Sequence, residues 1–491
     1  MKSKFSKVLS ILLSVVLVIS SFYLLHQVIR LNVLPSKFLF PLTIGVVVLD
    51  AIFILLLIYF SKNVVSKIVC IVLTLFICVA SCMGGYYISK TQNVLSSITN
   101  VAKHAKNTVS VIVKESSSIK NKSQLNGVSV GSLRLNEQGS KKALKELSGE
   151  GIVLNQTEYD SMTALLEAFY NGEVDSIIIN ESSRSQILDM EAYSNFDSNT
   201  RVVYQTSYKV KNNDSATSVS DITSKPFNVL ISGSDTRGGF DENGRSDVIM
   251  IATVNPKTHT ILLTSVPRDF YVTTACDAGD GCMQGALDKI THTGIHGTNT
   301  TKRTVEQLLG IEINYTFKVG FDTVTELVDV LGGVDVYVEP GYATTTSEFS
   351  VHEGVNHLNA QQALAFARER YSYTEGDRQR TKNQQQVLMG IVKEATKPSV
   401  ITNYAAIMDT MANTFSTTMS NEEITDLIKY QLNNNPTWKM EQYMVDGTGD
   451  TLMCAELGDA ASVMVPDQST VKMAKDKINA VLAGKSSEDV K

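Results

Sequence analysis

The stretch DVIMIATVNPKTHTILLTSV, residues 247–266, decides the fold of the C-terminal half of this chain. It contains two runs of aliphatic and β-branched residues that meet at Pro256 and Lys257. Such runs are typical of buried strands, and the short turn between them predicts antiparallel neighbours. A third apolar run, FNVLIS (227–232), comes shortly before them and predicts another strand of the same sheet.

Helical and strand patterns alternate downstream of this stretch. FDTVTELVDVLGG (321–333) has the apolar spacing of an amphipathic helix that ends at two glycines, and VDVYV (334–338) has the composition of a strand. We therefore expect an α/β domain over residues 226–491, with a mixed central sheet covered by helices.

A smaller α/β domain is predicted over residues 107–211, where β-branched runs alternate with segments of helical spacing. It holds no clustered arginine, histidine or paired carboxylates, so we expect an accessory role in spacing or partner contact, with small-ligand binding as the alternative. The polar segment KNNDSATSVSDITSKP (211–226) reads as a linker between the two domains.

Residues 1–90 predict a membrane anchor. Three apolar stretches, at about 8–29, 38–60 and 68–88, each approach the roughly 20 residues that a membrane-spanning helix needs. Positive charge is more frequent before the first stretch and between the second and third than in the first loop, which favours an N-terminus inside the cell. The large C-terminal part, after a polar stalk at 89–106, would then lie outside the cytoplasm.

Several single residues leave alternatives open. Asp50 lies within the second apolar stretch, where a charge is costly. It either contacts a partner or a lipid headgroup, or it is a protonated or helix-paired carboxyl. Cys276 and Cys282 flank a short Asp/Gly-rich loop and have the spacing for an extracellular disulfide. His292 and His296 are four residues apart, but Gly294 lies between them, and we expect structural roles rather than metal binding.

Arginine is concentrated in one part of the chain. Of twelve arginines, eight fall between Arg237 and Arg380, although the chain has a net charge of −6. That net charge does not favour a nucleic-acid partner. Because the guanidinium group grips two oxygens at once, the concentration predicts a phosphate or carboxylate ligand. Four of the eight arginines lie in ARERYSYTEGDRQR (367–380): Arg368, Arg370, Arg378 and Arg380.

Two aspartates at strand ends are candidates for a metal site. Asp235 follows the strand at 227–232, and Asp247 opens the next one. Mg²⁺ prefers one or two carboxylates together with substrate oxygens, so the pair predicts Mg²⁺, with Mn²⁺ as an alternative. Ordinary surface ion pairs with nearby arginines are the other reading. Arg268 and Asp269 follow the third strand, and open sheets place ligands at such strand ends. The two residues therefore either contact a ligand or form a structural ion pair with each other.

A helix is predicted from Asp377, a suitable N-cap, to the stop at Pro398. Its apolar stripe, followed backwards, passes through Gln384 and Arg380, so a charged residue lies on the side expected to be buried. A bound anion would offset that cost, and the helix N-terminus would add its own positive dipole. The alternative is a solvated helix start in which Arg380 pairs with Asp377 or Glu375.

The chain closely resembles the LytR-CpsA-Psr family, in several motifs that occur in the same order. They are VLISGSDTR (229–237), GRSDVIMIATVNPKTHTILLTSVPRDFYV (244–272), DKITHTGIHG (288–297), VLGGVDVYV (330–338), LNAQQALAFARERYS (358–372) and GDRQRTKNQQQ (376–386). The three apolar stretches and the intervening domain are similar to the streptococcal capsule-type members. In one departure from the pattern, Asn383 precedes Gln384 where some members carry arginine.

The resemblance implies a phosphotransferase on the outer face of a Gram-positive cell. It would move a glycopolymer, either capsular polysaccharide or teichoic acid, from undecaprenyl pyrophosphate to a peptidoglycan hydroxyl. The metal would be held by Asp235 and Asp247, and the catalytic groups would be Asp247, Arg268 and Arg370. The implied pyrophosphate-binding residues are Arg245, Arg268, Arg368, Arg370, Asp377, Arg380 and Gln384.

Other functions are compatible with the same residues. The enzyme would be a hydrolase if water replaced the peptidoglycan hydroxyl. A membrane-bound regulator of capsule expression is a third reading, although the segments expected inside the cell are too short for a folded DNA-binding domain. Asp247 and, after it, Asp269 are the candidates for the general base.

Overall fold

The computed structural model describes residues 2–60, 63–101, 104–134, 137–211, 215–234, 242–277, 281–397, 406–407, 410–411 and 415–490. The chain forms two compact units. The first comprises Met1–Ser97, Ala395–Ala412 and Ser420–Thr437, and the second comprises Ile98–Glu394, Asn413–Met419 and Trp438–Lys491.

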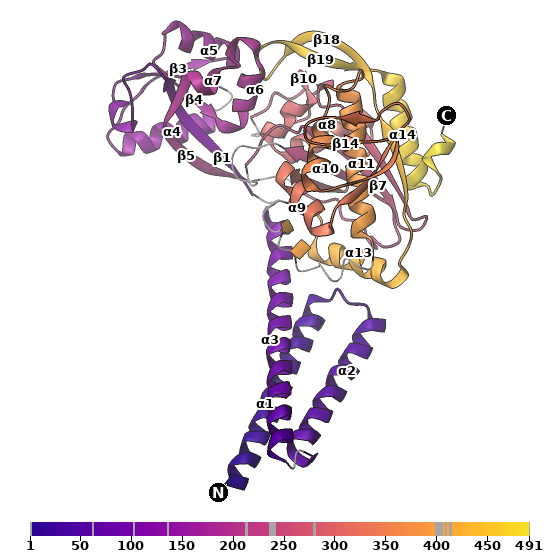
Figure 1. The fold of residues 1–491 in the computed structure, drawn as a ribbon. Helices are drawn as coiled ribbons and strands as arrows, with labels where there is room; N and C mark the ends of the chain where they lie inside the picture. The colour runs from indigo at the N-terminus through magenta and orange to yellow at the C-terminus, as the bar shows by residue number, and fades with distance from the viewer. Residues whose placement is uncertain are drawn as a thin grey trace. The chain divides into compact units, whose positions relative to one another are not determined.

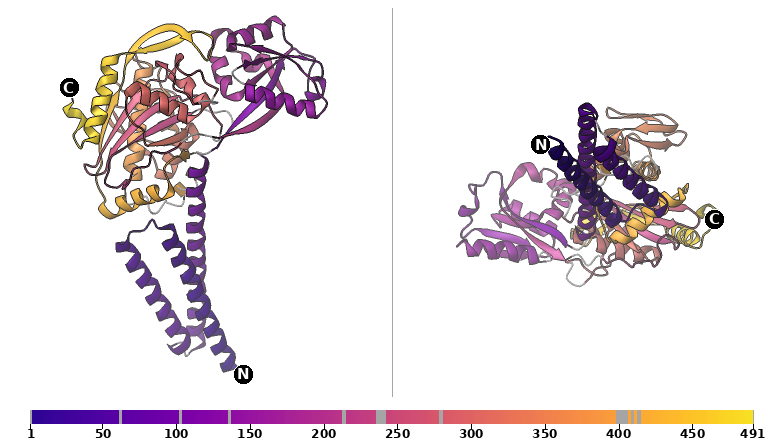
Figure 2. Two further views of the ribbon diagram at one scale, coloured as in Figure 1. Left: turned by 180° about the vertical axis from the view of Figure 1, so that it is seen from behind. Right: turned by 90° about the horizontal axis from the view of Figure 1, so that it is seen from below.

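The first unit contains three long apolar helices (Figure 1 and Figure 2). They are α1 (Lys2–Leu31), α2 (Ser36–Leu55), which continues as a π-helical segment to Phe60, and α3 (Val64–Val101). By length and composition, Lys7–Leu31, Ser36–Tyr59 and Val64–Thr99 are each able to cross a membrane. The stretch expected to be a polar stalk is therefore helical as far as Val101. The same unit includes α13 (Asn421–Asn434).

Small residues bring α1 and α3 close together. A Cβ atom built on Gly85 would lie 2.4 Å from the ring of Tyr23, so a residue with a side chain at this position would require the ring or the helices to shift. Between α1 and α2, Ser21 Oγ donates a hydrogen bond to Asp50 Oδ1 at 2.9 Å. Asp50 is therefore a helix-paired carboxyl, which was one of its two expected roles.

The second unit begins with a five-stranded sheet in the order β3-β2-β4-β1-β5. Its strands are β1 (His104–Lys114), β2 (Ser129–Leu133), β3 (Asn155–Tyr159), β4 (Ser176–Asn180) and β5 (Thr200–Lys211). Among the described residues, four α-helices accompany it: α4 (Glu137–Gly149), α5 (Met162–Asn171), α6 (Arg184–Asp189) and the short α7 (Phe196–Asn199). Side chains such as Ile112, Phe169 and Ile177 form its fully buried core.

The remainder of the second unit is built on a six-stranded sheet in the order β16-β11-β6-β7-β8-β17. Its strands are β6 (Phe227–Ser234), β7 (Val248–Asn255), β8 (Thr260–Val266), β11 (Tyr315–Gly320), β16 (Phe415–Thr417) and β17 (Lys439–Met444). β7 and β8 are antiparallel, as predicted, and β6 is antiparallel to β7, while β11 pairs in parallel with β6 and β17 pairs in parallel with β8. The expected α/β class with a mixed sheet is confirmed.

Two sets of helices accompany this sheet (Figure 1). α8 (Thr298–Leu309) and α14 (Gln468–Leu482) share one apolar core with strands β6–β8. α9 (Phe321–Leu331), α10 (Ala360–Arg368) and α11 (Asp377–Ala395) share a second core with β12 (Val334–Val338) and β15 (Gly354–Leu358). β12, predicted from VDVYV, pairs with β15 in a two-stranded ribbon outside the central sheet.

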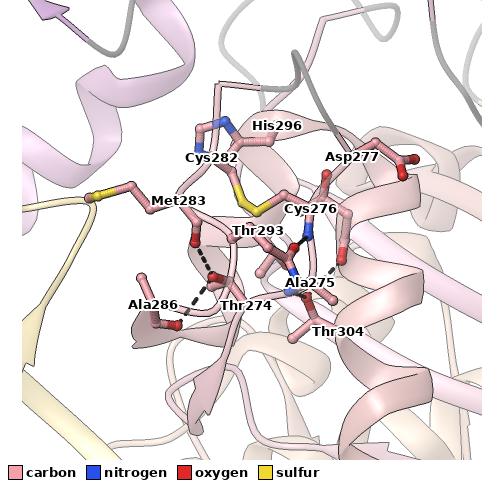
Figure 3. The surroundings of a disulfide bond; sticks show 12 residues. Thr274, Ala275, Cys276, Asp277, Cys282, Met283, Ala286, Thr293, His296 and Thr304 are labelled. Atoms are coloured by element: carbon pink, nitrogen blue, oxygen red, sulfur yellow. Dashed lines mark hydrogen bonds between the residues drawn. A yellow bond between two sulfur atoms is a disulfide. The ribbon is translucent and has the colours of Figure 1, made fainter.

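A disulfide joins Cys276 and Cys282, which settles the pairing that the sequence left open (Figure 3). The flanking backbone is fixed by Thr274, whose Oγ1 donates to Met283 O at 2.6 Å, and by Ala275, whose amide donates to Thr304 Oγ1 of α8 at 3.1 Å. The backbone on either side of the disulfide is thereby anchored to the domain core.

Candidate active site

A small pocket lies where the start of β7, the end of β8 and the first turns of α11 meet. Because β7 and β8 are antiparallel and pair Ile249 with Val266, the residue before β7 and the residues after β8 arrive at the same edge of the sheet. The pocket is lined by Asp247, Val248, Ile249, Ser265, Val266, Arg268, Asp377, Arg380, Thr381 and Gln384.

The loops that carry Asp247 and Arg268 are fixed by the segment 290–296. The amide of Thr291 donates to Arg268 O, and its carbonyl accepts from the amide of Ser246, both at 3.0 Å. A Cβ atom on Gly294 would lie 2.5 Å from Gly244 O, so only glycine allows this close approach. The spacing of the pocket residues is therefore set by backbone contacts.

Arg268 and Asp247 form the central pair of the pocket. Arg268 Nη1 donates to Asp247 Oδ1 at 2.8 Å, and Nη2 of Arg245 lies 3.9 Å from the same oxygen. Burial of Arg268 opposes its charge, but the carboxylates of Asp247 and Asp269 outweigh burial and raise its pKa above the usual value. Arg268 is thus held cationic at the edge of the sheet.

The N-terminus of α11 contributes a second arginine–aspartate pair. Arg380 Nη2 donates to Asp377 Oδ2 at 2.7 Å, while Arg370 Nη1 lies 3.8 Å from Asp377 Oδ1. Burial, together with the nearby charges of Arg268 and Arg370, lowers the pKa of Arg380 despite the opposing effect of Asp377. The guanidinium groups are close enough to repel one another, and an anion bound among them would relieve that repulsion.

The most buried face of helix α11 is shifted by one residue from the buried face that the sequence predicts. Gln379 and Asn383 are buried, and Val387 continues their line, whereas Arg380 and Gln384 lie beside it and line the pocket. Gln379 Nε2 donates to Asn383 Oδ1, and Asn383 Nδ2 donates to Phe366 O of α10, both at 3.0 Å. Asn383, the departure from the family pattern, therefore links two helices.

Not all of the clustered arginines point to the pocket. Arg368, at the end of α10, is exposed and does not belong to the lining residues. Arg378 turns instead to the segment after β17, where its Nε donates to Asp446 Oδ1 at 2.8 Å. Asp235, the other predicted metal ligand, lies outside the described residues.

Arg245 joins the pocket to the smaller domain, a contact that sequence analysis missed. Its Nη1 donates to the carboxylate of Asp189, the last residue of α6, while its Nη2 faces Asp247. Nothing in the sequence around Asp189 distinguishes it from an ordinary surface carboxylate. Ser265 and Thr381, which also line the pocket, were missed because single hydroxyl residues carry little sequence signal.

The two histidines and the second candidate base have carboxylate or cationic partners. His292 Nδ1 lies 2.7 Å from Asp288 Oδ1, and His296 Nε2 lies 2.9 Å from Glu456 Oε2. Asp269 lies 3.4 Å from Lys289 Nζ and 3.8 Å from Arg268 Nε. Among the described residues, no group of three or more histidine, cysteine, aspartate or glutamate side chains is arranged to hold a metal ion.

Some hydrogen-bond donors of the arginines in and beside the pocket have no acceptor among the described residues. Within the described part of the chain, the buried Nε atoms of Arg245, Arg268 and Arg380 donate no hydrogen bond. Buried donors without acceptors are costly, and charge-assisted bonds to phosphate are among the strongest that arginine forms. Two strand ends and a helix N-terminus thus place cations and two carboxylates in one pocket, which suits a phosphate ligand.

Comparison with known proteins identifies relatives of the larger domain. The model of the LytR_cpsA_psr family matches residues 192–480. The polyisoprenyl-teichoic acid–peptidoglycan teichoic acid transferase TagU of Bacillus cereus (strain AH820) is 31% identical over 241 residues, which cover 48% of this chain and 76% of the relative. TagU of Bacillus subtilis (strain 168) is 34% identical over 203 residues, which cover 41% of this chain and 63% of the relative.

Solved structures are also similar to this domain. The crystal structure of B. subtilis TagU is 28% identical and covers 52% of this chain and 97% of that chain, with a TM-score of 0.40. Protein gbs0355 from Streptococcus agalactiae is 25% identical and covers 53% of this chain and 89% of that chain, with a TM-score of 0.45.

Proposed function

This chain belongs to the LytR-CpsA-Psr family, and from that premise we propose that it is an extracytoplasmic phosphotransferase. It moves a glycopolymer, a capsular polysaccharide or a teichoic acid, from undecaprenyl pyrophosphate to a hydroxyl group of peptidoglycan. The named activity of the TagU relatives supports a transfer of this kind.

The convergence of arginines on one pocket carries the proposal. Arg268 and Arg380 line it from two different elements, and Arg370 approaches it through Asp377. Phosphoryl transfer depends mostly on positioning and on neutralising charge, both of which fixed guanidinium groups provide. Each is held by an aspartate, so little reorganisation is needed when the substrate arrives.

The reaction exchanges the phosphoanhydride bond of the donor for a phosphate ester bond. The acceptor hydroxyl oxygen attacks the phosphorus that carries the glycan, and the bond from that phosphorus to the bridging oxygen breaks. Undecaprenyl phosphate leaves, and the glycan becomes joined to peptidoglycan through a phosphodiester. Arg268, Arg370 and Arg380 stabilise the charge on the leaving phosphate, while Asp247 or Asp269 accepts the hydroxyl proton. The bond energy comes from the donor itself.

A divalent cation is part of this proposal. Asp247 supplies one carboxylate at the pocket wall, and Asp235 would supply the second from outside the described residues. This donor set, completed by phosphate oxygens of the substrate, suits Mg²⁺ or Mn²⁺. When bound, the ion would neutralise phosphate charge that the arginines alone do not offset. Asp247 Oδ1 already accepts a hydrogen bond from Arg268, so the carboxylate of Asp247 would bind both this arginine and the cation.

The membrane helices would keep the pocket near a substrate that is confined to the bilayer. The excess of positive charge before the first helix and between the second and third favours placing the pocket outside the cytoplasm. A lipid pyrophosphate is an activated donor that needs no nucleotide there.

The full-length chain in lipid nanodiscs, given a lipid-pyrophosphate glycan with a labelled sugar and peptidoglycan chains, tests the proposal. We expect the label to become attached to peptidoglycan, and Arg268→Ala to abolish attachment. Label released as free glycan instead would identify a hydrolase. A folded, donor-loaded protein that neither attaches nor releases the label would refute the phosphotransferase assignment.

A further inference from the structure

Tyr371 presents an unusually exposed aromatic ring next to one of the arginines of the site. It is 84% exposed, more than any other large hydrophobic side chain in the part of the chain that the structure describes, the membrane helices included. Exposing an aromatic ring forgoes the stabilisation that its burial would give. An exposed ring beside a substrate pocket is therefore a candidate contact surface.

The ring is held in one position. Glu369 Oε1 accepts hydrogen bonds from the amides of Tyr371 at 2.6 Å and Ser372 at 2.9 Å, which fixes the backbone of the turn after α10. Arg370 Nη2 donates to the Tyr371 hydroxyl at 2.6 Å, and the guanidinium carbon lies 4.7 Å from the ring centroid. The side chain is thus fixed before any ligand binds, which reduces the entropy lost on binding.

The contacts of Arg370 show where the ring of Tyr371 lies relative to the pocket. The other end of that guanidinium group lies 3.8 Å from Asp377, which lines the pocket. Arg370 therefore extends from the pocket rim to the ring of Tyr371. In the proposed donor, the first sugar is bonded directly to the pyrophosphate, so it must leave the pocket beside the groups that hold the phosphates.

The chemistry of a sugar ring matches that of the exposed tyrosine face. One face of a pyranose presents mainly C–H groups, which pack against the π-face of an aromatic ring, while its hydroxyl groups remain solvated at the edge. Because every pyranose has such a face, the contact would tolerate different first sugars. If the only role of the Tyr371 ring were to hold Arg370 in position, most of its surface would not need to be exposed to solvent.

We propose that Tyr371 is the platform on which the first sugar of the donor stacks. This inference rests on the proposed function, because it takes the donor to be a lipid pyrophosphate that carries a glycan. It adds a sugar subsite, formed by a residue next to the pyrophosphate-binding Arg370, and it makes the turn at 369–372 part of donor selection.

The test compares the binding of two donors to the full-length chain in nanodiscs. One probe is undecaprenyl pyrophosphate, and the other is the same lipid carrying a single N-acetylglucosamine. Tyr371→Ala should weaken binding of the sugar-bearing probe by about 10-fold, roughly the contribution of one stacked aromatic contact, and leave the sugar-free probe unchanged. Tyr371→Phe should keep the preference, and Tyr337→Ala, a half-exposed tyrosine on β12, should alter neither affinity.

An equal loss for both probes in Tyr371→Ala would show that the ring only braces Arg370, and no loss for either would show that it has no role, so both results overturn the proposal. The binding assay does not require turnover. A wild-type chain that prefers the sugar-bearing probe but transfers nothing would therefore contradict the proposed function and leave the sugar subsite intact.

Discussion

Arg268 and Asp247 meet across the ends of two antiparallel strands, with Nη1 of the arginine 2.8 Å from Oδ1 of the aspartate. The sequence separates them by a complete hairpin, and the fold brings them back to one pocket wall. In the proposed reaction, this pair would orient a guanidinium group toward the phosphates of the donor, and it would hold a carboxylate where a divalent cation or an acceptor proton is needed.

Replacing Arg268 by lysine should keep the charge and lose the planar fork. We expect the catalytic efficiency kcat/KM to fall by ~100-fold or more, the usual effect of removing a preorganised donor, with little change in the melting temperature. Initial rates of glycan transfer measure the effect. Arg378→Lys is the matched control, since Arg378 lies in the neighbouring arginine cluster but pairs with Asp446, and it should transfer at the wild-type rate.

Removing the charge of Asp189 should reveal whether the smaller domain supports catalysis. Asp189 contacts Arg245, whose other end faces Asp247. We expect Asp189→Asn to lower kcat/KM by about 10-fold and to have no further effect in an Arg245→Ala background, because coupled residues are not additive. Equal losses from Asp189→Asn in both backgrounds would mean that the effect does not pass through Arg245.

The stability of the larger domain should depend on pH through Glu441 of β17. Burial alone would raise the pKa of Glu441, but Lys439 and hydrogen bonds from Ser486 and Ser487 outweigh it and lower the pKa to about 2. The ionised carboxylate therefore stabilises the fold fully above the ordinary value of 4.5, and this stabilisation is lost as the pH falls toward 2.

Apparent melting temperatures of the wild type and Glu441→Gln, measured from pH 7 to pH 3, test this expectation. The difference between them should be largest at neutral pH and shrink as the pH falls. Glu348→Gln, which changes an exposed glutamate, should follow the wild type throughout. A difference that stays constant with pH would show that the carboxylate charge is not what stabilises this region.

Loss of the disulfide should affect stability but not chemistry. Closing the short loop from Cys276 to Cys282 is expected to contribute about 2 kcal/mol by restricting the unfolded chain. The double variant Cys276→Ser/Cys282→Ser should melt at a lower temperature and should no longer respond to reducing agent. Its transfer rate at low temperature should equal that of the wild type, because none of the described residues of the loop (276–277 and 281–282) lines the pocket. A strong loss of transfer would mean that the loop positions the site.

The central strands were predictable because their signals are local. β6, β7 and β8 are nearly continuous apolar runs. A recognisable turn at Pro256 and Lys257 joins β7 to β8, and the antiparallel pairing of these two strands places Asp247 beside Arg268. β11 and β17 were not predicted. Both pair in parallel with partners distant in sequence, and β17 (KMEQYM) carries polar residues that do not mark a strand by themselves.

Parts of the site depended on contacts that local patterns do not encode. The side-chain amides of Gln379 and Asn383 are buried, and their NH2 groups donate hydrogen bonds to Asn383 Oδ1 and Phe366 O, respectively. A hydrophobicity pattern assigns such residues to the surface, which shifted the predicted stripe of α11 toward Arg380. Asp189 belongs to another domain, and only the tertiary fold brings it to Arg245.

The fate of a labelled phosphorus atom tests the central claim most directly. A donor carrying radioactive phosphorus next to the glycan and tritium in the glycan should deliver both labels to peptidoglycan in equal amounts when the full-length chain acts on it. Neither label should arrive with Arg268→Ala or Arg380→Ala. If the wild type attached glycan to peptidoglycan without the phosphorus, the proposed phosphoryl transfer would be wrong. If the arginine variants transferred both labels normally, the pocket lined by Arg268 and Arg380 would not be the site of transfer.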